Sequence, residues 1–211
     1  MKLTKHEHAY LALEEQGSKL IIDPGKFSND LGDITNVVAV VITHSHFDHL
    51  NADNIVAIMA ASPGAQILST QTVAGKLQGR PVTVVSPGQT ITVGPFKLEF
   101  FGGKHAYIHD TTPDEQNVGV LVNDNLYYPG DSLAQPGVPV KTLAVPVSGP
   151  WLKIGEAVDF MVAVKPALSV PAHDGLLTPV GETITEDWLT QYSSTFGGVY
   201  RHLAVGDAIE I

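Results

Sequence analysis

The sequence predicts an α/β protein, of the α+β type, in which two sheets pack face to face with helices on the outside. Three observations carry this prediction. Each half of the chain shows strands followed by helices, and each half delivers metal-type side chains at strand ends. The continuous apolar run from Val37 to Ile42 is typical of a buried strand. Layered folds of this kind place their sites at strand termini.

The first half predicts a β meander followed by alternating strands and helices. Pro-Gly and Gly-Pro pairs mark turns between several segments. The segment 51–61 predicts a helix with Ile55, Ile58 and Met59 on one face. A second helix is expected over 70–76. Strands are expected over 8–14, 19–23, 37–43, 66–69, 82–85, 90–93 and 96–101.

The second half echoes this order. Segments 118–122 and 125–128 predict a hairpin around Asn123-Asp124. Pro129-Gly130-Asp131-Ser132 follows as another strand end that carries an acid. Further strands are expected over 143–147, 167–170 and 208–211, and helices over 154–164 and 185–196.

Composition narrows the class of protein. The chain has 211 residues, 44% apolar residues and no linker segment, so we expect one domain over residues 1–211. No apolar run has the length of a membrane span, and the N-terminus lacks a signal-peptide core, so no membrane partner is expected. The absence of cysteine favours the cytoplasm, and the formal charge of −10 argues against nucleic-acid partners.

The run Thr-His-Ser-His-Phe-Asp-His-Leu over 43–50 directly follows the apolar strand. It contains His44, His46, Asp48 and His49, and so holds three of the nine histidines of the chain. His44 and His46 are two apart and project to the same side of an extended segment, so they can hold one ion together. Asp48 and His49 point differently and can serve a second ion. Imidazole and carboxylate ligands without thiolates favour zinc, with manganese, iron or nickel as alternatives.

Three more candidate ligands stand at strand ends. His105 follows the strand over 96–101, Asp131 follows the strand that ends at Tyr128, and His173 follows the strand over 167–170. Taken singly, each has an ordinary alternative, such as a surface histidine or a turn aspartate. Their common position at strand termini, together with the histidine run, favours a shared metal site.

The histidine run, the later histidine, Gly130-Asp131-Ser132 and Pro171-Ala172-His173 resemble the metallo-β-lactamase-fold hydrolases over nearly the whole chain. Together with Ile22-Asp23-Pro24-Gly25 and His8-Ala9, they are similar to the small metal-dependent hydrolases related to the L-ascorbate-6-phosphate lactonase. The resemblance implies a four-layer αβ/βα sandwich with a two-metal site at one edge.

The resemblance also implies a role for each candidate. His44, His46 and His105 would bind the first ion, Asp48, His49 and His173 the second, and Asp131 would bridge them. Asp23 would orient ligands without binding metal. Two questions stay open: His109 competes with His105 for the third histidine position, and His8 is either a supporting or substrate-contacting residue or a plain polar residue.

The expected function is a hydrolase in which a dinuclear metal-bound hydroxide attacks a small ester, lactone or phosphodiester, with Asp48 orienting the nucleophile or accepting its proton. A small molecule is the expected partner, and a homo-oligomer is compatible with the sequence. The alternatives are a di-iron oxidoreductase on the same scaffold and a non-catalytic metal-binding protein. Di-iron members typically carry glutamate at the position of His46, which favours hydrolysis here.

Overall fold

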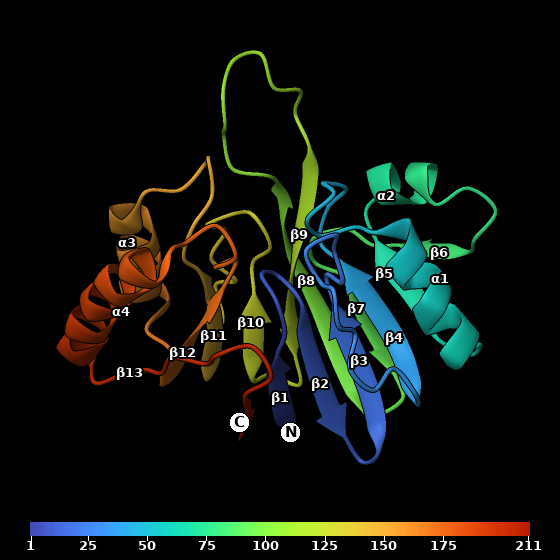
Figure 1. Ribbon diagram of the computed structural model, residues 1–211, viewed down its shortest axis with the longest axis horizontal. Coiled ribbons are helices and arrows are strands. Elements are labelled where there is room, and N and C mark those ends of the chain that lie inside the picture. Colours follow the sequence, from blue (N-terminus) through green and yellow to red (C-terminus); the bar gives the residue numbers. More distant parts are fainter.

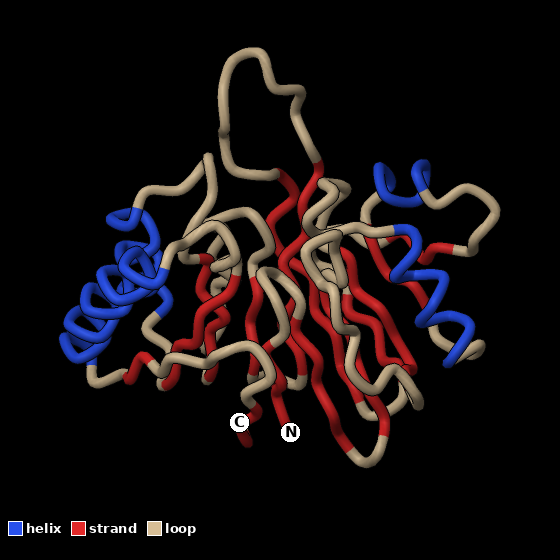
Figure 2. Tube along the Cα trace, viewed as in Figure 1, coloured by secondary structure: helices blue, strands red, loops and turns tan.

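The computed structural model describes residues 1–211 and consists of two β-sheets packed face to face with helices outside both (Figures 1 and 2). This αβ/βα sandwich is the predicted fold class, which is confirmed. The first sheet and its helices comprise β1 (Lys2–Lys5), β2 (Leu11–Glu15), β3 (Ser18–Ile22), β4 (Val37–Ile42), α1 (Ala52–Ala61), β5 (Gln66–Ser69), α2 (Gln71–Lys76), β6 (Val82–Val84) and β14 (Ala208–Glu210).

The second sheet takes up the following part of the chain. Its elements are β7 (Thr90–Val93), β8 (Phe96–Lys104), β9 (Gln116–Val122), β10 (Leu126–Tyr128), β11 (Thr142–Pro146), α3 (Ile154–Val164), β12 (Leu168–Ala172), α4 (Pro179–Ser193), a 3-10 turn (Ser194–Phe196) and β13 (Val199–Tyr200).

Each sheet has seven strands, in the orders β14-β1-β2-β3-β4-β5-β6 and β13-β12-β11-β10-β9-β8-β7. Pairing is parallel from β3 to β6 and from β10 to β13, and antiparallel elsewhere. The last strand pairs with the first, so the two chain ends lie close together (Figure 1). Strands β4, β8, β10 and β12 all end at the edge from which the long β8–β9 loop rises in Figure 1.

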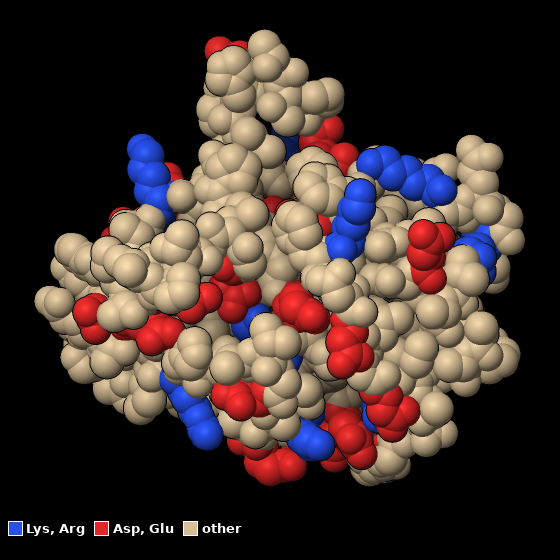
Figure 3. Space-filling view, viewed as in Figure 1, with Lys and Arg blue, Asp and Glu red and all other residues tan.

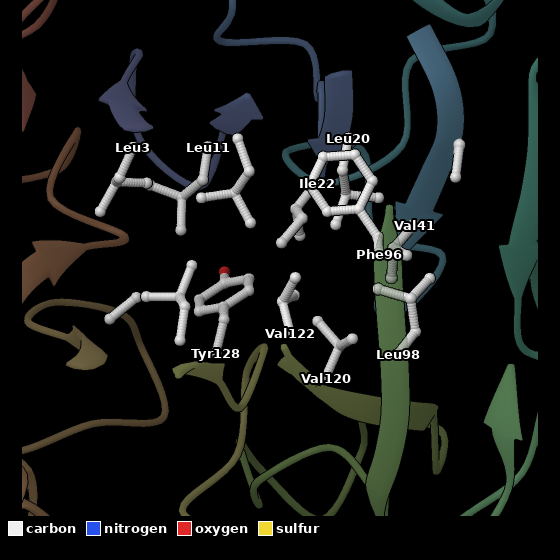
Figure 4. Packing of buried hydrophobic residues seen from close by; sticks show 14 of the residues in the cluster. Leu3, Leu11, Leu20, Ile22, Val41, Phe96, Leu98, Val120, Val122 and Tyr128 are labelled. Carbon is white, nitrogen blue, oxygen red and sulfur yellow. The ribbon is translucent and has the colours of Figure 1, made fainter. Parts of the chain in front are cut away.

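The core between the sheets holds 23 buried hydrophobic residues drawn from both. Leu20 and Ile22 of the first sheet face Phe96 and Val120 of the second in Figure 4. Two smaller clusters lie outside the sheets, one under α1 and α2 and one under α3 and α4. Each fully buried aliphatic or aromatic side chain contributes about 1.5–3 kcal/mol to stability. This core therefore fixes how the two sheets pack against each other.

The helices follow their capping residues. Asn51 caps α1 and Thr70 caps α2, close to the predicted starts. The predicted helix over 185–196 is wrong at its start, since α4 begins at Pro179, with Thr178 accepting a hydrogen bond from the Gly181 N–H. None of the helices combines the length and the apolar character that crossing a membrane requires.

The predicted strand over 8–14 is wrong at its start. Residues 11–14 lie in β2, but His8 has a left-handed φ of 58° and lies in the turn between β1 and β2. A non-glycine residue in this conformation breaks a strand, and the loose alternation over 8–14 gave no sign of the break. The hairpin around Asn123-Asp124 is confirmed: both residues have positive φ, 53° and 51°, as the turn requires.

Candidate metal centre

The side chains predicted as ligands converge at the shared sheet edge, and they form two groups. In each group, one nitrogen or oxygen of every member lies within 4.8 Å of the others. The first group contains His44, His46, His105 and Asp131, and the second contains His8, Asp48, His49 and His173. The structure therefore brings together all seven side chains that the sequence singled out, and it adds His8.

Asp131 lies between the two groups. Its Oδ1 is 3.1 Å from Nε2 of His49. Its Oδ2 is 3.3 Å from Nε2 of His105 and 3.2 Å from Nε2 of His173. The carboxylate thus faces imidazoles of both groups, which is the position that a bridging ligand needs. Inside the first group, Nε2 of His44 lies 3.1 Å from Nδ1 of His46.

A buried network orients two of the histidines. The Nδ1–H of His49 donates to Oδ2 of Asp23 at 2.7 Å. The Thr43 hydroxyl also donates to Oδ2 of Asp23, at 2.6 Å, and therefore accepts from Nδ1–H of His44 at 3.0 Å. With both Nδ1 atoms protonated, the Nε2 lone pairs of His44 and His49 point into the centre. Asp23 touches no other member of either group and so occupies the supporting place expected of it.

Several buried atoms in the centre form no well-aligned hydrogen bond within the protein, although they lie close to one another. They are Nε2 of His49 and His105, both ring nitrogens of His173, and Oδ1 of Asp131. The Nδ1–H of His105 donates to the Ala106 carbonyl at 2.6 Å, which leaves its Nε2 free as well. Buried polar atoms are rarely left unpaired, and such clustering is typical of metal ligands. Imidazole and carboxylate donors at these spacings fit divalent cations such as zinc.

The charges in the centre shift the pKa values of its members strongly. Burial lowers the pKa of His44 well below its usual value, and His49 beside it adds to this effect. Burial alone would also lower the pKa of His49, but the Asp131 and Asp23 carboxylates outweigh it and raise that pKa well above the usual value. The pKa of His173 rises to about 9, because Asp131 overcomes the effect of burial. Cations and protons therefore compete for the same imidazoles.

His8 joins the second group by position, yet its hydrogen bonds give it another role. Its Nδ1 accepts the Gly175 N–H at 3.1 Å. The proton is therefore on Nε2, which donates to Oδ2 of Asp48 at 3.2 Å. His8 consequently supports Asp48. This position agrees with a supporting residue, which is one of the roles that the sequence left open for His8.

The structure places His105 and His109 differently with respect to the centre. His105 lies in the first group. His109 is exposed on the β8–β9 loop, where its Nδ1 pairs with the Thr111 hydroxyl, and it belongs to neither group. It lines the cavity beside the centre and so faces the space open to a substrate.

Comparison with known proteins places this centre in a family. The profile of the Beta-lactamase superfamily domain matches residues 2–173, from the first strand to the last histidine of the centre. The chain belongs to this family. Protein Rv0786c of Mycobacterium tuberculosis is 36% identical over 200 residues, covering 92% of this chain and 94% of that protein. The UPF0173 metal-dependent hydrolase of Aeropyrum pernix is 26% identical over 209 residues, covering 82% of each chain.

Solved structures share the superfamily fold. Igni18, a metallo hydrolase from Ignicoccus hospitalis, has a TM-score of 0.73 at 18% identity and covers 99% of this chain and 97% of its own. CmlA, a diiron β-hydroxylase from Streptomyces venezuelae, has a TM-score of 0.76 at 14% identity and covers 100% of this chain and 54% of its own. These structures share the fold, and the family profile confirms the resemblance to the metallo-β-lactamase-fold hydrolases at the level of the superfamily.

Some residues that shape this superfamily centre were missed from the sequence. Buried Asn117 accepts the Asp131 N–H at 3.0 Å and donates to the Pro129 carbonyl at 2.8 Å, so it sets the turn that presents Asp131. Glu115 accepts the Ser45 N–H at 3.2 Å inside the histidine run. Thr43 alone had a signal in the sequence, since it is the first residue of the histidine run, whereas Asn117 and Glu115 act through contacts distant in sequence.

A cavity of about 360 Å³ opens beside the first group. Residues 104–110 and 112–115 of the raised loop seen in Figures 1 and 2 line it together with His46. This volume suits a small molecule. In Figure 3, acidic side chains gather across the middle and lower part of the face, and basic side chains are scattered among and above them.

Proposed function

We propose that this protein is a metal-dependent hydrolase that holds two divalent cations, with zinc favoured, and cleaves a small ester, lactone or phosphodiester. One observation carries the proposal: two groups of imidazoles and carboxylates share Asp131 at the sheet edge, beside a cavity of small-molecule size. The relatives described as metal-dependent hydrolases support the same reading.

The two groups divide the ligands. His44, His46 and His105 would hold one ion; Asp48, His49 and His173 would hold the other, and Asp131 would serve both. When bound, the ions would lower the pKa of a water molecule and polarise the substrate oxygen. The protein's share is to keep the Nε2 lone pairs directed inward, through Asp23 and the other acceptors at Nδ1.

Asp48 has the clearest role among the chain's own groups. Burial would raise its pKa, but the neighbouring His173 and His8 imidazoles lower that pKa below its usual range. The carboxylate therefore stays ionised as a hydrogen-bond acceptor, with Oδ2 held by His8 at 3.2 Å. From this position Asp48 would orient the nucleophile or accept its proton.

The substrate is proposed as a class. A cavity of about 360 Å³ has the size of a small-molecule site. The narrower resemblance to the lactonase-related hydrolases, carried by His8-Ala9 and Pro171-Ala172-His173, is the reason for including lactones. The cytoplasmic compartment and a homo-oligomeric state stay predictions from the sequence.

Metal analysis and turnover test this function together. Protein purified without added metal should carry about two equivalents of zinc and hydrolyse members of an ester, lactone and phosphodiester panel. Asp48→Asn should lower turnover by about 10²–10⁴-fold with the fold retained, as judged by circular dichroism. Asp187→Asn, on the exposed face of α4, is the matched control and should behave as the wild type. Full activity of Asp48→Asn would contradict the proposed mechanism.

The same measurements distinguish the alternatives. Two equivalents of iron with a visible absorption band would favour an oxidoreductase, a chemistry known for CmlA on a similar fold. Full loading with two ions and no turnover across the panel would favour a metal-binding protein without catalysis.

A further inference from the structure

The Trp151 indole lies buried against the carboxylate shared by the two groups. Trp151 is 7% exposed, and its Nε1–H donates a hydrogen bond of 2.8 Å to Oδ2 of Asp131. Its ring also meets the imidazoles of His105 and His173 edge-on, each with ring centroids 5.9 Å apart. These two imidazoles come from different groups, so one side chain contacts both halves of the centre.

The loop that carries Trp151 is shaped for this contact. It follows β11 and contains Gly149, whose φ of 148° favours glycine. A Cβ at Gly149 would lie 2.7 Å from Nε1 of Trp151, so a larger residue would displace the indole. The Ser148 hydroxyl donates to the carbonyl of His173 and ties the same loop to the second group.

The hydrogen bond falls on the carboxylate oxygen that faces the most imidazoles. Oδ2 of Asp131 lies 3.2 Å from Nε2 of His173 and 3.8 Å from Nε2 of His44. An indole N–H can only donate a hydrogen bond, so it holds this oxygen and takes no proton from the carboxyl group. Removal of a hydrogen-bond partner of a metal-binding side chain typically weakens metal binding by about 10–100-fold.

We propose that Trp151 is a positioning residue that aligns Asp131 so that both ions bind as a pair. The proposal rests on the two-ion function proposed above. Without the indole N–H, the carboxylate is free to rotate about its side-chain bonds, and its oxygens no longer meet both groups at once. The consequence is weaker binding of at least one ion.

Zinc affinity tests this role. Trp151→Phe keeps an aromatic ring but removes the N–H, and Trp188→Phe is the matched control, because Trp188 is 45% exposed and stacks on Tyr192 away from the centre. In competition with a chromophoric chelator, Trp151→Phe should bind at least one zinc ion about 10–100-fold more weakly, and Trp188→Phe should match the wild type. Equal zinc affinities in all three proteins would overturn the proposal.

Fluorescence provides a second test that leaves the loop intact. In Trp188→Phe, Trp151 is the only tryptophan. Its emission should change as zinc binds and level off at two equivalents. The reason is that the Asp131 carboxylate, which accepts the indole N–H, would then also bind zinc. Emission that stays constant during zinc uptake would overturn the proposal. Failure of wild-type protein to take up zinc, measured by the same chelator, would instead overturn the two-ion function itself.

Discussion

Hydrogen bonds at the Nδ1 atoms decide what the histidines of the centre can do. His44, His49 and His105 each donate from Nδ1 to a protein acceptor, and this leaves Nε2 directed inward as the nitrogen open to a cation or a proton. His8 has the opposite arrangement, since its Nδ1 accepts the Gly175 N–H. One proton position thus separates three candidate ligands from a supporting residue of the same type.

Asp23 gives a direct test of this network. Its carboxylate accepts from the Thr43 backbone N–H, the Thr43 hydroxyl and Nδ1–H of His49, all fully buried. Asp23→Ala should lower the free energy of unfolding by about 3–5 kcal/mol, since it leaves buried partners unpaired. Urea denaturation measures this change, and Asp30→Ala, on an exposed loop, serves as control. A loss below about 1 kcal/mol would show that the network matters little.

The pH dependence of stability follows from the raised pKa of His173. That pKa is about 9 in the folded protein and about 6.5 when unfolded, so the stabilisation is full below pH 6.5 and is lost as pH rises through 9. Chelator-treated protein should therefore lose on the order of 3 kcal/mol over this window. Thermal unfolding across pH 6–10 measures it. His173→Gln should show a shallower slope, because the raised pKa of His49 acts in the same sense, and an identical slope in that variant would contradict the assignment.

At the scale of elements, tight turns position the residues of the centre. The turn after β3 passes directly beneath the histidine run, where the Lys26 N–H donates to the Phe47 carbonyl at 2.8 Å. Gly25 makes this approach feasible, because a Cβ there would lie 1.7 Å from the carbonyl oxygen of Asp48. The Asn54 side chain closes the contact from α1 by donating to the Gly25 carbonyl at 2.9 Å.

Gly25→Ala should consequently displace the run. We expect a loss of about 1–3 kcal/mol or more in unfolding free energy from overpacking, together with weaker zinc binding. Gly155→Ala is the control: it lies on an exposed face of α3 with open space around it, and it should stabilise the protein by about 0.5–1 kcal/mol. Chemical denaturation of both variants measures the difference. Wild-type stability and zinc affinity in Gly25→Ala would contradict this account.

At the scale of the whole molecule, the centre joins the two sheets. The histidine run follows β4 of the first sheet, whereas His105, Asp131 and His173 follow strands of the second. Cations shared by these residues would act as a link between layers that otherwise meet only through the apolar core and nearby polar contacts.

Removal of metal should therefore lower thermal stability. Each ion at a free concentration of 100 Kd contributes about 2.7 kcal/mol, equivalent to roughly 5–10 °C for a chain of this size. Calorimetry before and after chelation measures the shift. Zinc should restore the melting temperature, while magnesium, which prefers oxygen ligands, should not. An unchanged melting temperature after chelation of a zinc-loaded sample would contradict this role.

The elements with strong local signals were predicted well. Apolar spacing located α1 and α3, and apolar runs bounded by turn residues located most strands. The failures came where local signals conflict with tertiary contacts. The turn at His8 is held by the His173 N–H donating to the His8 carbonyl at 2.9 Å, across most of the chain. The two-residue strand β13 forms only by pairing with β12.

The sequence by itself determined the layered fold, the residue types of the centre and the strand ends that present them, because apolar periodicity and the spacing of the histidine run are local properties. The tertiary structure alone decided which nitrogen of each imidazole faces inward, that His105 and not His109 enters the group, and that Asn117 and Trp151 hold Asp131. These features depend on hydrogen bonds between segments far apart in the chain, and a hydrogen bond forms only where folding brings donor and acceptor within about 3 Å.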